Sequence, residues 1–147
     1  MKKTVETAVA LLLAVTWLSV DTVNARSCAP PLPVEREFEV SRAVFIGTIT
    51  KIEVQDRGGA LDTRTVATFS VERAWKGAEA STIRVGTCGG GNVICTVGLT
   101  FNLGERYVVF AMGPDLGASK CGRTGTESHY LWNETMDWLL RQPKPAG

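Results

Sequence analysis

Two neighbouring stretches of β-branched and aromatic residues constrain the fold of this chain most strongly. Ala43 to Val54 is rich in valine, isoleucine and threonine, and Gly47 within it indicates a bulge or a tight bend. Arg64 to Trp75 alternates apolar and polar side chains, which is typical of a strand with one buried face. The stretch between them, Gln55 to Asp62, contains two adjacent glycines. The two stretches are therefore predicted to form a long hairpin.

The alternation also predicts which side chains share a face of each strand. In the first strand we expect one in-phase set, made of Val44, Ile46, Ile52 and Val54. In the second strand we expect Ala67, Phe69, Val71 and Trp75 on one face and Thr68, Ser70 and Glu72 on the other.

Three further strands are predicted after the hairpin. Ser81 to Thr87 is short, and Arg106 to Met112 is apolar on both faces, which places it in the middle of a sheet. A last short strand is expected at Cys121. About five short strands favour a small closed or partly open β-barrel, and a β-sandwich is the alternative.

Two helices complete the prediction. Val34 to Ser41 is predicted as a short helix with Phe38 as its buried anchor. Glu127 to Arg141 carries apolar side chains at helical spacing, and Pro143 stops it. We expect the tryptophans of the domain, Trp75, Trp132 and Trp138, to belong to the core.

The start of the chain resembles a secretory signal peptide. A cationic Met1-Lys2-Lys3 precedes an apolar run from Ala8 to Leu18, and Val23-Asn24-Ala25 suits signal peptidase. A lipid anchor on Cys28 is the alternative, but lipid-attachment signals have small apolar residues at the position where this chain has Arg26. The apolar run is shorter than the roughly 18 residues of a membrane-spanning helix. We therefore predict a secreted or periplasmic protein without a membrane span.

This interpretation divides the chain into three parts. Residues 1–25 are the signal peptide, residues 26–141 form one domain, and residues 142–147 are a disordered tail. The formal net charge is +1, and no run of like charge occurs, so nucleic acid and anionic membranes are poor candidates for a partner.

Four cysteines lie in the predicted exported part, namely Cys28, Cys88, Cys95 and Cys121. An even number in an exported chain predicts two disulfides. Structural zinc is the alternative, but the chain has no C-x-x-C pair and only one histidine, His129.

No group of residues predicts an enzyme. His129 has no obvious nucleophile beside it and is expected at the surface or at a rim, and Glu35, Glu37 and Glu39 are expected on a solvated helix or turn. Asn133-Glu134-Thr135 matches a glycosylation sequon, but it lies inside a predicted helix. We expect no cofactor.

A resemblance emerges from the order of several short motifs. Arg26-Ser27-Cys28-Ala29-Pro30-Pro31 resembles the mature start of the tissue inhibitors of metalloproteinases, where Cys-x-Cys-x-Pro-Pro follows the signal peptide. The other similar motifs, in chain order, are Ala43 to Thr48, Trp75-Lys76-Gly77, Cys95, Glu105 to Ala111, Cys121 and Leu131-Trp132-Asn133. The resemblance implies a mainly β protein with the netrin-like OB-fold, a five-stranded barrel with a short N-terminal and a C-terminal helix.

The resemblance also implies a function. In that family the α-amino group and carbonyl of the first mature residue bind the catalytic zinc of the target protease. Here Arg26 would supply both ligands, and Ser27 would enter the specificity pocket. Cys28, Ala29 and Pro30 would form the inhibitory ridge, with Val93 and Ile94 in the neighbouring loop.

The sequence departs from the family pattern at Arg26, which replaces the family's first cysteine. Cys95 thereby loses its family partner, and the extra Cys88 is the natural replacement. The family pattern pairs Cys28 with Cys121. The leading hypothesis is a secreted inhibitor of zinc metalloproteinases. The alternative is a netrin-like module that binds another extracellular or periplasmic protein through its barrel surface.

Overall fold

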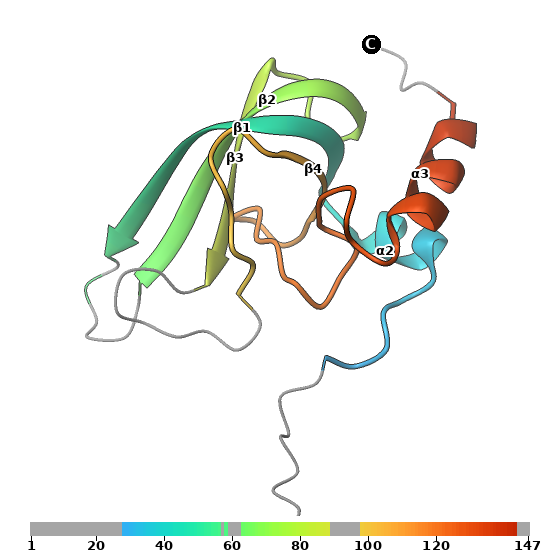
Figure 1. The fold of residues 1–147 in the computed structure, drawn as a ribbon, viewed down its shortest axis with the longest axis horizontal. Helices are drawn as coiled ribbons and strands as arrows, with labels where there is room; N and C mark the ends of the chain where they lie inside the picture. The colour runs from blue at the N-terminus through green and yellow to red at the C-terminus, as the bar shows by residue number, and fades with distance from the viewer. Residues whose placement is uncertain (1–27, 57, 59–62, 89–97, 144–147) are drawn as a thin grey trace, which may run out of the picture.

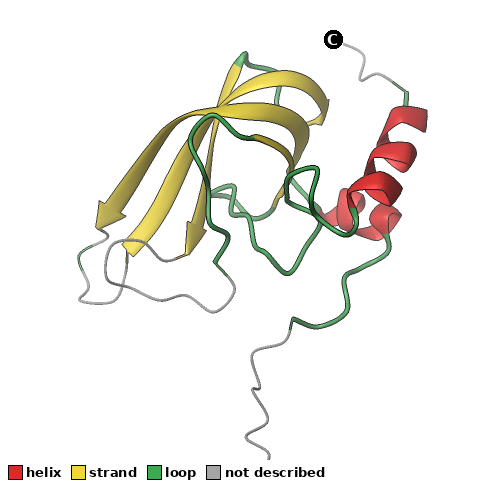
Figure 2. Ribbon diagram, viewed as in Figure 1, coloured by secondary structure: helices red, strands yellow, loops and turns green. Residues whose placement is uncertain are grey.

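The computed structural model describes residues 28–56, 58, 63–88 and 98–143 (Figure 1). They form a mainly β structure with a curled antiparallel sheet and two helices beside it (Figure 2). The elements in chain order are α2 (Val34–Val40), β1 (Ala43–Asp56), β2 (Thr63–Lys76), β3 (Thr82–Cys88), β4 (Arg106–Ala111) and α3 (Trp132–Arg141). The four strands begin and end within two residues of the predicted positions.

The sheet has the strand order β3-β2-β1-β4, and every neighbouring pair is antiparallel. β1 pairs with β2 from Val44 to Asp56 and with β4 only from Ala43 to Thr48. Gly47 lies at a register shift, and a Cβ there would lie 2.5 Å from the carbonyl oxygen of Ser70. The bulge that the sequence indicates at Gly47 is confirmed, and only glycine permits the close approach of the two backbones there.

Bulges overturn part of the predicted face pattern. The pairing of β1 with β2 skips Glu72 and Trp75 in β2 and Thr50 in β1. An extra residue in one strand moves the following side chains to the opposite face. Trp75 therefore packs on the other side of the sheet from Ala67 and Phe69, and the prediction that they share a face is wrong. The in-phase set of β1 divides for the same reason, since Val44 and Ile46 lie in one cluster and Ile52 packs against the other.

The two faces of the sheet support two hydrophobic clusters. The larger one includes Phe45, Phe69, Phe101 and Tyr107, whose rings meet edge to face at centroid distances of 5.4–6.1 Å. The second joins the opposite face to the helices and comprises Val34, Val44, Ile46, Trp75, Val108, Phe110 and Leu139, with Phe38, Trp132, Met136 and Trp138 packed against it. Fully burying a large apolar side chain contributes about 1.5–3 kcal/mol. This second cluster fixes both helices to the sheet.

A short seam brings the two edges of the sheet together. Gly117 makes a parallel bridge to Gly86 of β3 and an antiparallel bridge to Met112, which directly follows β4. Four backbone hydrogen bonds of 2.8–3.0 Å form this seam. No strand forms at Cys121, because residues 120–123 form turns, and bridges to the sheet lie on either side of it, at Gly117 and at Gly125, which pairs with Val108 of β4.

Both helix predictions need correction. α3 begins at Trp132 rather than at Glu127, since residues 127–131 are turns and a bend. In α2 the buried residues are Val34 and Glu37, whereas Phe38 is only half-buried. The expectation that Glu37 is solvated is wrong, because its carboxylate has an internal partner.

Candidate functional site

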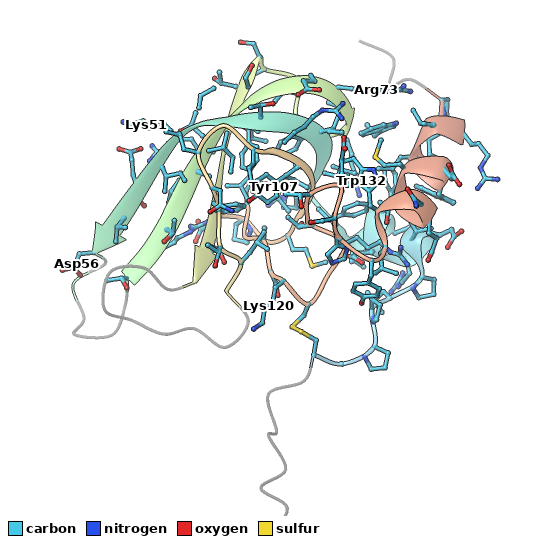
Figure 3. The ribbon with its side chains drawn as sticks, in the orientation of Figure 1. Lys51, Asp56, Arg73, Tyr107, Lys120 and Trp132 are labelled. Carbon is cyan, nitrogen blue, oxygen red and sulfur yellow. A yellow bond between two sulfur atoms is a disulfide. The ribbon has the colours of Figure 1, made fainter. Side chains whose placement is uncertain are left out.

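A disulfide fixes the start of the described chain. Cys28 is bonded to Cys121, 93 residues further along, which is the pairing that the family resemblance implies. In Figure 3 this bond joins the segment leading into α2 to the loop that precedes α3. The described chain is thus tethered to that loop at its first residue, Cys28.

Two residues after Cys121, Arg123 makes a second attachment to the same segment. Its Nη2 donates to the backbone carbonyl of Leu32 at 3.1 Å, and its backbone N–H donates to Glu37 Oε1 at 2.8 Å. Cys121 and Arg123 therefore hold the chain at Cys28, at Leu32 and at Glu37. We call Cys121–Arg123 the clamp.

The guanidinium of Arg123 is almost completely buried, with 3% of its side chain exposed. It lies 3.5 Å from Glu37 Oε2 and 2.9 Å from Glu134 Oε1, and its Nη1 donates to Thr135 Oγ1 at 3.1 Å. Removing one partner of such a buried pair costs about 3–5 kcal/mol. The clamp thus also connects α2 to α3.

Glu37 packs against the clamp, and Gly122 within the clamp leaves room for its carboxylate. Burial raises the pKa of the Glu37 carboxyl, and the backbone N–H and the positive charge of Arg123 oppose that rise. A Cβ on Gly122 would lie 2.4 Å from Glu37 Oε1. Glycine at this position leaves room for the carboxylate.

The predicted ridge is only partly described. Cys28, Ala29 and Pro30 are exposed, and they lie ahead of the Leu32 attachment. The other predicted site residues, Arg26, Ser27, Val93 and Ile94, lie outside the described residues, as does Cys95. The backbone of Cys88 ends β3, but its predicted disulfide with Cys95 also lies outside the described part.

An open cavity of about 540 Å³ lies next to the clamp. Its lining comes from the approach to β4, from Lys120 and from the loop before α3, and it includes Leu99, Asn102, Glu105, Tyr107, Thr124, His129 and Tyr130. His129 is half-buried rather than fully exposed, and its Nδ1 accepts a hydrogen bond from the backbone N–H of Leu131 at 3.3 Å. Burial, followed by the charge of Arg123, lowers the pKa of His129.

Sequence reasoning missed Glu37, Arg123 and the cavity. Glu37 and Arg123 are 86 residues apart, and neither lies in a pattern that predicts burial of a charge. Across the described ranges, no three His, Cys, Asp or Glu side chains gather into a group able to hold a metal ion.

Comparisons with known proteins identify no family for this chain. No protein-family model matches the chain, and no curated protein matches it. In the described part of the chain, no helix has the length and apolar character needed to cross a membrane.

Proposed function

We propose that this protein is an exported inhibitor of zinc metalloproteinases that acts through its mature amino terminus at Arg26. The observation that carries the proposal is the Cys28–Cys121 disulfide, because it fixes the chain two residues after the predicted cleavage site. Arg123 reinforces this anchor through the carbonyl of Leu32. Ala29 and Pro30, between the two attachments, are exposed and accessible to a partner.

The fold that we propose is the netrin-like OB barrel. An OB-fold is a five-stranded, partly open barrel. The strand order β3-β2-β1-β4 and the parallel contact of Gly117 with β3 support this assignment, with the Gly117 seam in the place of the fifth strand. The two helices pack on the outer face of the sheet through the cluster that contains Trp75 and Leu139.

The chemistry of an amino-terminal chelator is straightforward. An α-amino group titrates at about 7.7–8.0, so a useful fraction is neutral near physiological pH, and zinc displaces the remaining proton. The amine and carbonyl of Arg26 then close a five-membered chelate ring at the position that a catalytic water occupies. Ser27 enters the specificity pocket, and the Cys28–Pro30 ridge lies along the cleft.

Arg26 and Ser27 precede the anchor and lack the disulfide that the family's first cysteine provides. Ordering two backbone residues on binding costs about 2–4 kcal/mol. That cost lowers the affinity by about 30- to 1000-fold relative to a tethered terminus. We therefore propose a weaker inhibitor than one with a cysteine at this position.

Selective acetylation of the α-amine tests the proposal. The mature protein should inhibit a metalloproteinase catalytic domain, and acetylation should abolish inhibition because an amide nitrogen is a poor zinc ligand. A variant with one alanine added ahead of Arg26 should fail in the same way. Equal inhibition before and after acetylation would exclude the mechanism.

Arg26 in place of the family cysteine favours a second candidate function, a netrin-like module that binds an extracellular or periplasmic protein through its barrel surface. This candidate predicts that neither acetylation nor the added alanine changes binding. The same pair of modified proteins therefore separates the two functions.

A further inference from the structure

The cavity beside the clamp is lined by the most exposed large apolar side chain of the described residues, Tyr130. Among the described residues, the two most exposed large apolar side chains are Tyr130, at 76%, and Leu103, at 66%. Tyr130 lines the cavity, and Leu103 directly follows the lining residue Asn102. Tyrosine is enriched among the residues that dominate protein–protein binding energies. An exposed tyrosine at the wall of an open cavity is therefore available to a binding partner.

The cavity carries one anionic and one cationic side chain. Glu105 is exposed and keeps its negative charge, and its Oε2 accepts hydrogen bonds from Asn102 Nδ2 at 2.9 Å and from the Tyr107 hydroxyl at 3.0 Å, which hold the carboxylate beside Tyr107. Lys120 is exposed, and within the described ranges it has neither a hydrogen bond nor an ion pair. The cation that remains available at this cavity is therefore its ammonium group.

His129 adds a neutral donor to the same wall. Its Nδ1 accepts the N–H of Leu131, so in the neutral ring Nε2 carries the proton, and no described residue accepts a hydrogen bond from it. Its ring lies 4.8 Å from that of Tyr130 and would collide with a Cβ on Gly125. The imidazole is thus held between the loop backbone and the exposed tyrosine.

The cavity and the ridge are neighbours. Lys120 directly precedes Cys121, which is bonded to Cys28 at the start of the ridge. Figure 3 shows the Lys120 side chain close to that disulfide. A protein that contacts Cys28 to Pro30 is therefore close enough to reach Lys120.

We propose that this cavity is a second contact for the target of the amino terminus. It receives a surface loop of the protease that places an apolar side chain against Tyr130 and a carboxylate against Lys120. This inference rests on the proposed inhibitory function. It names the partner's chemistry: an acidic loop with an exposed apolar residue, close to the protease's active-site cleft.

Four variants test this contact. Tyr130→Ala should raise the inhibition constant at least ten-fold, and Lys120→Glu should slow association, with the largest effect at low ionic strength. The matched controls are Leu140→Ala, an apolar side chain 56% exposed on α3, and Lys51→Glu, a lysine 63% exposed on β1. Both controls should inhibit as the wild type does, and all four should keep the wild-type midpoint of urea unfolding.

The outcomes separate this inference from the proposed function. If the wild type inhibits and Tyr130→Ala and Lys120→Glu inhibit equally well, the second contact is wrong and the inhibitory function stands. If the wild type inhibits no metalloproteinase, the proposed function is wrong, and the inference falls with it. A loss that the two control variants share would also overturn the inference, because it would show no special role for the cavity.

Discussion

Removing the Cys28–Cys121 disulfide should weaken the fold by a calculable amount. The cross-link spans 93 residues, and in the chain-entropy model a loop of this length stabilises the native state by about 4.7 kcal/mol. Replacing both cysteines by serine should therefore lower the free energy of unfolding by about 4–5 kcal/mol in urea titrations. The matched control replaces Cys88 and Cys95, whose predicted disulfide would close a much shorter loop and contribute about 2–3 kcal/mol.

The same double substitution should remove inhibition while the protein is still folded. Without the bond, the chain is free as far as Leu32, so the residues from Cys28 to Pro31 join Arg26 and Ser27 in needing order on binding. Four additional residues at the lower limit of about 1 kcal/mol each cost about 4 kcal/mol, or roughly 1000-fold in the inhibition constant. Inhibition is measured at low temperature, where circular dichroism shows the variant folded. A folded variant that inhibits as the wild type does would refute the idea that the disulfide positions the amino terminus.

Three further predictions concern the clamp, the bulge in β1 and His129. Gly122→Ala should lower the free energy of unfolding by about 3 kcal/mol, because its Cβ would lie 2.4 Å from the Glu37 carboxylate. The control is Gly117→Ala, whose Cβ would have its nearest atom at 3.8 Å and which should change the free energy of unfolding by less than about 1 kcal/mol. Gly47→Ala should cost at least about 2 kcal/mol in the same urea assay, since its Cβ meets a backbone oxygen at 2.5 Å, and a neutral result would show that β1 and β2 can move apart. The pKa of His129 is lowered in the folded state, so the stability present above pH 6.5 should be lost as the pH falls through the folded pKa. His129→Gln should reduce this pH dependence of the free energy of unfolding. Identical pH profiles of the variant and the wild type would contradict the lowered pKa.

The strands were predictable because their local chemistry agrees with their environment. β1 and β2 are rich in β-branched and aromatic residues, and β4 is apolar on both faces because it lies against both hydrophobic clusters. The bulge at Gly47 was also predictable, since an isolated glycine within a strand indicates a bulge or a tight bend.

What the sequence did not reveal depends on contacts between distant residues. Trp75 changes face because of a bulge at Glu72, and a skipped residue leaves no mark in an alternating pattern. Glu37 looks like an ordinary helix-surface carboxylate until Arg123 is placed beside it. The closing contact at Gly117 is a bridge rather than a strand, so no run of β-forming residues marks it.

The most direct test of the central claim is the crystal structure of the mature protein bound to a zinc metalloproteinase catalytic domain. The account predicts the α-amino nitrogen of Arg26 at about 2.0–2.1 Å from the catalytic zinc, with the carbonyl oxygen of the same residue as a second ligand. It also predicts an intact Cys28–Cys121 bond beside the protease cleft. A complex in which the amino terminus lies away from the zinc, and the metal keeps its water, would contradict the account.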